Sequence, residues 1–313
     1  MTANRSTAAP PAPVRPGSLA AWRVAVRPQS LLVAFSPVLV GATLGYARAG
    51  AIDPLAALLV LCSAILIQVL TNMQNDVGYT VRGGDSSGTR TGLPRATANG
   101  WLSVCQMRAG IVAVALLATA FGLALTAYRG WPVLAIGVVS LAAALAYMGG
   151  PKPIAYTPFG EATVFVFFGL VAVAGTDWVL TGSVGAASLL ASVAIGALAS
   201  AALAVNNHRD RAHDHLVGRR TFAVCFGDNA SRGLYSVLLL GPFLAVPAMA
   251  LLARSAALLL PLLLLPMAWR LRHDFRCCAP GLAFNPILFR TFRLELGFAA
   301  MLSAGALLGQ VLA

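Results

Sequence analysis

The chain has 313 residues, of which 58% are hydrophobic and only 10% are charged, and its net charge is +12. An average soluble domain carries about 25% charged residues, so this composition excludes a soluble globular protein, and the high hydrophobicity excludes a disordered one. Long apolar runs, without the alternation typical of membrane barrels, predict an all-α integral membrane protein. We attribute the positive charge to basic loops on one side of the membrane and not to a nucleic-acid partner.

A helix that spans a bilayer needs about 20 mostly apolar residues. Residues 1–18 contain no such run, so we expect a disordered cytoplasmic tail there and not a secretory signal. Residues 19–313 are expected to form one transmembrane domain. Its nine candidate spans are 29–48, 54–79, 103–127, 131–149, 159–181, 184–206, 231–253, 255–271 and 292–312.

The basic residues predict the orientation of these spans. With a cytoplasmic N-terminus, all of the 22 Lys and Arg residues except Arg48, Arg129 and Arg254 fall on the cytoplasmic side. Cytoplasmic loops of membrane proteins carry the excess of Lys and Arg. We therefore expect a multi-pass protein of the cell (inner) membrane, with the C-terminus on the side opposite the N-terminus.

Acidic residues are rare, and two clusters of them follow spans. Residues 72–76 (Asn-Met-Gln-Asn-Asp) end the second span and are followed by Asp85, and residues 206–210 (Asn-Asn-His-Arg-Asp) end the sixth and are followed by Asp214. Helical spacing puts an asparagine and the aspartate of each run on one face. Carboxylates near membrane depth are costly and usually functional. A purely structural role is also open, in which these side chains cap helix ends and pair with neighbouring arginines.

The residue types in both clusters suit a hard cation together with a phosphate. Carboxylate and amide oxygens are ligands of Mg²⁺, which also bridges to phosphate oxygens. Arg82, Arg90 and Arg95 follow the first cluster, and Arg219 and Arg220 follow the second. Aspartates, Mg²⁺ and arginines together predict a site for a diphosphate leaving group.

Two other acidic residues receive no catalytic role. We expect Glu161 to make a structural polar contact inside the bundle. Asp177 falls on the outer side and is expected to be solvated.

Several stretches resemble the UbiA-type membrane prenyltransferases, and the resemblance extends over about residues 20–310. Residues 75–85 with 92–100 are similar to the first aspartate-rich region of that family. Residues 206–224 resemble the second region, in the form found in the branch that acts on 1,4-dihydroxy-2-naphthoate. The stretch 146–176 and the opening 27–41 are similar to the same branch.

The resemblance implies nine transmembrane helices around a central cavity, with the two aspartate regions facing each other near the cytoplasmic side. It implies Mg²⁺ and a polyprenyl diphosphate, whose tail lies in an apolar tunnel open to the lipid bilayer. Loss of diphosphate gives an allylic cation, which an electron-rich aromatic acceptor attacks. In this branch the ring carboxylate leaves as CO₂, giving demethylmenaquinone in menaquinone biosynthesis.

The resemblance also implies roles for individual residues. The expected metal ligands are Asp76, Asp85, Asp210 and Asp214, and all of these except Asp85 are expected to be essential for catalysis. The expected substrate-binding residues are Arg27, Asn72, Asn75, Arg82, Arg95, Tyr147, Tyr156, Asn207, Arg219 and Arg220. The tyrosines among them could stabilise the cation or orient the acceptor, although tyrosine near a membrane interface is often only an anchor.

One departure from the family pattern bears on the reaction. The first motif usually reads Asn-Asp-x-x-Asp, but Tyr79 stands at the position of its second aspartate. A phenol is a poor ligand for Mg²⁺ because its pKa is about 10. Asp76 and Asp85 could suffice, the substrate could differ, or activity could be weak. A damaged homologue with a binding or regulatory role is a further interpretation. The residues are also compatible with an acceptor such as 4-hydroxybenzoate or homogentisate, and with a membrane transporter.

Overall fold

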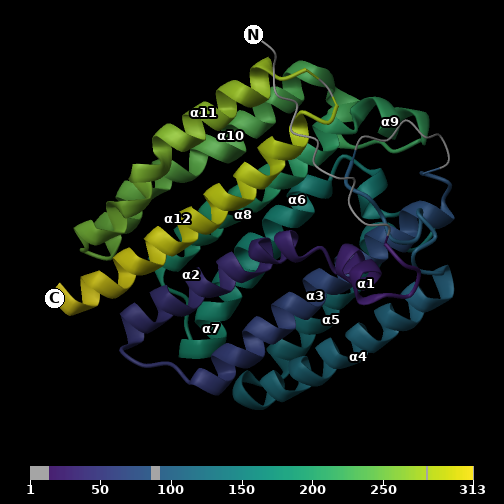
Figure 1. Ribbon diagram of the computed structural model, residues 1–313. Helices are drawn as coiled ribbons and strands as arrows, with labels where there is room; N and C mark the ends of the chain where they lie inside the picture. The colour runs from purple at the N-terminus through teal and green to yellow at the C-terminus, as the bar shows by residue number, and fades with distance from the viewer. Residues whose placement is uncertain (1–13, 86–91, 280, 313) are drawn as a thin grey trace, which may run out of the picture.

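The computed structural model describes residues 14–85, 92–279 and 281–312, and this part of the chain is helical without strands (Figure 1). The first half contains α1 (Leu19–Val26), η1 (Pro28–Leu31), α2 (Leu32–Ala49), α3 (Pro54–Val81), α4 (Val104–Arg129), α5 (Trp131–Met148) and η2 (Ile154–Tyr156). The second half contains α6 (Gly160–Val164), η3 (Phe165–Ala174), α7 (Gly175–Thr181), α8 (Ala186–Arg209), α9 (Arg211–Leu216), α10 (Phe222–Leu252), η4 (Ala256–Leu264), α11 (Leu265–Cys277) and α12 (Phe284–Leu312).

Eight of the predicted spans correspond to helices that are long and apolar enough to cross a membrane, within the residues described. The remaining predicted span, 255–271, is divided between the 3₁₀-helix η4 and the helix α11. Pro261 lies inside η4 and Pro266 lies in the first turn of α11. Proline lacks an N–H and interrupts the α-helical ladder, which explains the division. Both pieces pack against α10 and α12, so the segment still belongs to the bundle.

The structure lengthens two of the predicted helices at their N-terminal ends. α10 begins at Phe222, where the sequence predicts 231, and α12 begins at Phe284, where the sequence predicts 292. Both N-terminal extensions contain polar residues, so a search for apolar runs does not include them in the predicted helices. The backbone of α10 turns at Gly227 (φ 81°), so its first turn is set off from the rest of the helix. The sequence also missed α1, which Ser18 caps by accepting a hydrogen bond from the Ala21 N–H.

Helix α8 lies in the centre of the bundle, in contact with α2, η3, α10 and α12 (Figure 1). Its sequence is rich in alanine and most of its length is buried. At its crossing with the π-helix η3, a Cβ added to Gly169 would lie 2.9 Å from the Cα of Gly196. Small residues permit such close helix packing in membranes, and here they fix the position of α8.

The first and last described segments are each fastened to a distant part of the chain. Near the start, the Gly17 N–H donates to the Trp101 carbonyl at 2.8 Å. The last helix ends beside α2, where the Gln310 amide donates to the Ala47 carbonyl at 2.5 Å. The expected disorder of residues 1–18 falls mainly on residues 1–13, which lie outside the described residues, and the division at residue 18 remains a prediction.

The expectation that Asp177 is solvated is wrong. Its side chain is fully buried and pairs with Arg48 at 3.0 Å, and its second oxygen accepts from the Gly185 N–H at 2.9 Å. Helix α7 packs on α2 at this point, which closes Asp177 from solvent.

Candidate active site

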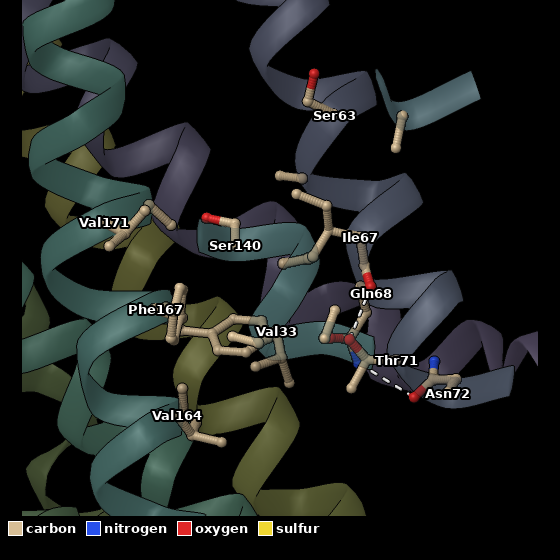
Figure 2. Close-up of a pocket in the computed structure, with 18 of the residues that line it drawn as sticks. Val33, Ser63, Ile67, Gln68, Thr71, Asn72, Ser140, Val164, Phe167 and Val171 are labelled. Carbon is tan, nitrogen blue, oxygen red and sulfur yellow. Dashed lines mark hydrogen bonds between the residues drawn. The ribbon is translucent and has the colours of Figure 1, made fainter. Parts of the chain in front are cut away.

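A cavity of about 430 Å³ is lined by residues of α2, α3, α4, α5, η3, α7, α8 and α12. Its walls are mostly apolar, as Figure 2 shows for Val33, Ile67, Phe167 and Val171. One end of the cavity is polar and is formed by the C-terminal parts of α3 and α8 and by the junction before α2. The polar residues at that end are Arg27, Ser30, Gln68, Asn72, Asn75, Asn206 and Arg209. The cavity thus combines a charged end with a long apolar compartment.

Asn72 joins α3 to the start of α2. Its amide donates to the Val26 carbonyl and to the Ser30 hydroxyl, both at 2.8 Å, and its oxygen accepts from Gln68 at 3.3 Å. Arg27, the residue between α1 and η1, has a left-handed backbone (φ 54°) and lines the cavity. The structure therefore brings the predicted residues Asn72 and Arg27 to one wall.

Asn75 and Asp76 are neighbours but face different surroundings. Asn75 lines the cavity. The Asp76 carboxylate is fully buried and accepts hydrogen bonds from the N–H groups of Ala96 (2.8 Å) and Thr97 (2.9 Å) and from the Thr97 hydroxyl. Asp76 therefore fastens the loop after residue 91 to α3. Its role as a metal ligand remains a prediction.

That loop carries Arg95, whose guanidinium pairs with Asp85 at 3.0 Å. The second Asp85 oxygen accepts from the Thr80 hydroxyl at 3.2 Å. The Cζ atom of Arg95 lies 3.5 Å from the centre of the Tyr79 ring. Arg90, the other cation in this stretch, lies outside the described residues.

The second acidic cluster surrounds the turn between α8 and α9. Arg209 donates to both oxygens of Asp210, at 2.9 and 2.7 Å, and to Asn285 at 2.7 Å. Asp214 is fully buried; its Oδ1 accepts from Arg219 at 2.7 Å and from the Tyr79 hydroxyl at 3.1 Å. Its Oδ2 has no hydrogen-bond partner among the residues that the structure describes. Burial raises the pKa of Asp214, whereas Arg219 acts in the opposite direction.

The remaining predicted residues separate into two groups. Tyr147 is buried and lines the cavity, and Tyr156 lies between the guanidiniums of Arg219 (5.8 Å) and Arg82 (5.6 Å). Asn207 instead points into the bundle and donates to Glu161 at 2.9 Å, which supplies the expected structural contact of that acid.

Two arginines of the predicted set lie at the protein surface. Arg220 is exposed, and its backbone N–H donates to the Tyr156 carbonyl at 3.2 Å. Arg82 is exposed as well and donates to the Gly150 carbonyl, close in sequence to the exposed Lys152. The predicted site residues do not include Arg209, Gln68 or Ser30, which also line the cavity. Of these, Arg209 could have been predicted, because it directly precedes Asp210 in the sequence.

The oxygen-rich donor set fits a hard divalent cation. Asn75 and Asn206 line the cavity, and in the described part of the chain Asp214 retains one buried carboxylate oxygen without a partner. Within the described residues, no three His, Cys, Asp or Glu side chains gather as a metal cluster. The residues that could bind a cation are therefore amides and isolated carboxylates, and a substrate would have to supply the other ligands.

A comparison with known families identifies the chain. The model of the UbiA prenyltransferase family matches residues 34–279. The chain belongs to this family. It is therefore an enzyme that transfers prenyl groups, and it is a multi-pass membrane protein.

Curated relatives and solved structures agree with this assignment. The 1,4-dihydroxy-2-naphthoate octaprenyltransferase of Escherichia coli is 34% identical over 71% of this chain and 73% of its own length. The protein of the same name from Haemophilus influenzae is 31% identical over 92% of this chain and 96% of its own. The apo structure of a UbiA homologue from Aeropyrum pernix matches with a TM-score of 0.64 at 14% identity, covering 90% of this chain and 98% of that one.

A second solved structure carries ligands. The UbiA homologue from Archaeoglobus fulgidus bound to GPP and Mg²⁺ matches with a TM-score of 0.61 at 16% identity, covering 90% of this chain and 99% of that one. At these identities the two structures establish the fold, an all-α membrane bundle of the UbiA type.

Proposed function

We propose that this UbiA-family enzyme transfers a polyprenyl group from polyprenyl diphosphate to 1,4-dihydroxy-2-naphthoate, in a Mg²⁺-dependent reaction of menaquinone biosynthesis. The C–O bond of the allylic diphosphate breaks and a C–C bond forms on the ring. The ring carboxylate leaves as CO₂, giving demethylmenaquinone as its quinol. The observation that carries this proposal is the cavity, which has arginines and amides at one end and apolar walls along its length.

The donor occupies this cavity with its diphosphate at the polar end. Arg27 and Arg209 line that end, and guanidinium forks bind phosphate oxygens bidentately. The prenyl tail lies along the apolar walls, where burial of hydrocarbon is favourable. When bound, Mg²⁺ supplies positive charge that stabilises the departing diphosphate. Asn75, Asp210 and Asp214 are the residues that would hold it, with Asp76 and Asp85 as further predicted ligands.

The acceptor lies beside Tyr147, which is buried in the cavity wall. Its phenol hydroxyl can form a hydrogen bond with a hydroxyl of the naphthoate, and its ring face can stabilise an allylic cation. Arg27 offers a partner for the acceptor carboxylate before CO₂ leaves. The relatives named after the naphthoate acceptor favour this substrate over 4-hydroxybenzoate or homogentisate.

The enzyme lies in the cell (inner) membrane, with the polar end of the cavity and the N-terminus facing the cytoplasm. The distribution of basic residues supports this orientation. A reporter enzyme fused to the C-terminus and active only outside the cytoplasm would be active in this orientation. Activity of an N-terminal fusion instead would contradict it.

The decisive experiment is an assay of purified protein with polyprenyl diphosphate, 1,4-dihydroxy-2-naphthoate and Mg²⁺, followed by mass spectrometry. A prenylated, decarboxylated naphthoquinol that fails to form in EDTA is the expected result. Conversion of 4-hydroxybenzoate or homogentisate alone would replace the proposed acceptor. No product with any of the three would contradict the proposal.

A further inference from the structure

Aromatic rings and guanidiniums alternate beside the polar end of the cavity. The Tyr79 ring has the Cζ of Arg95 at 3.5 Å from its centre and that of Arg219 at 5.3 Å. Arg219 also lies over Tyr156, which Arg82 approaches from its own position. Distances below about 6 Å are those of cation–π contacts. Tyr79 thus sits between two arginines that reach it from different loops.

The Tyr79 hydroxyl completes a connection between the two acidic clusters. It donates to Asp214 Oδ1 at 3.1 Å, and Asp214 also accepts from Arg219. Tyr79 is 1% exposed and belongs to α3, whereas Asp214 belongs to α9. The ring is held further by His213, which stacks on it at 6.0 Å and 18°.

The charge of the side chain at position 79 determines whether the contact between α3 and α9 needs a cation. Arg95 is already paired with Asp85 and Arg219 with Asp214, so a second carboxylate placed beside Asp214 would lack a compensating positive charge. A neutral phenol donates a hydrogen bond to Asp214 instead, and the guanidiniums of Arg95 and Arg219 supply the positive charge.

We propose that Tyr79 is a positioning residue that joins the two halves of the site in place of a metal ion, so that the substrate-free enzyme needs no divalent cation to assemble it. The hydroxyl orients Asp214, and the ring holds Arg95 and Arg219 for the diphosphate. Mg²⁺ then enters together with the diphosphate and is not a resident ion. The naming of diphosphate as the ligand and of Mg²⁺ as the cation rests on the proposed function.

The first test measures thermal unfolding of the full-length protein in detergent, without substrate, in EDTA and in Mg²⁺. We expect the wild-type midpoint to be the same in both. Tyr79→Asp places a carboxylate beside Asp214, so its midpoint should fall in EDTA and recover in Mg²⁺. A wild-type midpoint that rises with Mg²⁺ as much as that of Tyr79→Asp would overturn the proposal, as would a Tyr79→Asp midpoint indifferent to Mg²⁺. Neither result depends on turnover, so the proposed reaction can fail separately.

Tyr235→Phe is the matched control. Tyr235 is equally buried and shares a hydrogen bond of 2.9 Å with Thr291, and its ring stacks on Phe275. This variant also loses one buried hydroxyl, but its midpoint should remain indifferent to Mg²⁺. A Mg²⁺ response in Tyr235→Phe would attribute the effect to general destabilisation and overturn the proposal.

The second test separates the ring from the hydroxyl through kinetics with polyprenyl diphosphate. Tyr79→Leu removes the stack with Arg95, and we expect the KM for the donor to rise about tenfold while the KM for the acceptor stays unchanged. Tyr79→Phe keeps the ring and should rescue most of this loss. Equal KM values for Tyr79→Leu and wild type would show that the ring does not position the arginines.

Discussion

For Asp76, the role expected from the sequence differs clearly from the environment found in the structure. Its position in the sequence resembles that of a family metal ligand, yet its carboxylate accepts three hydrogen bonds from Ala96 and Thr97. A side chain that satisfies buried N–H groups is structural, whatever else it does. The loop it fastens brings Arg95 to Tyr79, so Asp76 acts on the site through that loop.

Asp76→Ala should therefore release the loop as well as impair activity. Two buried N–H groups lose their acceptor, at a cost of about 1–3 kcal/mol each. We expect trypsin to cleave after Arg95 in the folded variant. Asp177→Ala is the control, since Asp177 is also buried and also accepts from a loop N–H. Loss of activity in Asp76→Ala without cleavage after Arg95 would favour a purely metal-binding role.

The two asparagines at matching ends of α3 and α8 should behave differently. Asn75 lines the cavity, whereas Asn207 pairs with Glu161 inside the bundle. Asn75→Ala should lower kcat/KM for the polyprenyl diphosphate and leave thermal unfolding unchanged. Asn207→Ala should lower the unfolding midpoint, because Glu161 loses a buried partner. A lower unfolding midpoint in Asn75→Ala, with a lower kcat/KM in Asn207→Ala, would contradict the placement of Asn75 in the cavity and of Asn207 inside the bundle.

At the scale of elements, the sequence predicted the helices wherever an apolar run was uninterrupted. It failed at the amphipathic α1, at the N-terminal extensions of α10 and α12, which contain polar residues, and at the prolines that divide η4 from α11. Those boundaries depend on local and tertiary partners, as with Ser18 capping α1. Helical spacing could place an asparagine near Asp210 but could not decide between Asn206 and Asn207, because both lie within one turn.

The crossing of η3 and α8 offers a test of packing at this scale. Gly169→Leu places a side chain against the backbone of Gly196, and overpacking costs about 1–3 kcal/mol. We expect a lower unfolding midpoint and loss of activity, because α8 carries Asn206 and Arg209 to the cavity. Gly233→Leu on the exposed face of α10, where an added Cβ meets no neighbour, should be tolerated. Equal midpoints for the two variants would argue against a close crossing.

At the scale of the whole molecule, the cavity extends most of the way through the bundle. Along α5 its lining runs from Tyr147 to Val133, a length of about 21 Å at 1.5 Å per residue. Leu125, Val133 and Val179 pack together at the end of the cavity that is remote from Arg27 and Arg209. We infer that this apolar cluster limits the length of prenyl tail that the cavity accepts.

Val133→Trp should then discriminate between donors of different length. The added ring fills the remote end, so the KM for a long polyprenyl diphosphate should rise while that for geranyl diphosphate stays unchanged. Val139→Trp, on the exposed face of the same helix, is the control. A uniform rise for both donors would mean that the variant distorts the cavity and does not shorten it.

The loop at residues 149–153 has a practical consequence. Lys152 is the sole lysine of the sequence, and it is exposed two residues beyond Gly150, whose carbonyl binds Arg82. An amine-reactive fluorophore would therefore attach to a single side chain, next to the stacked arginines and tyrosines. Quenching of that fluorophore would report substrate entry in real time, without any engineered attachment point.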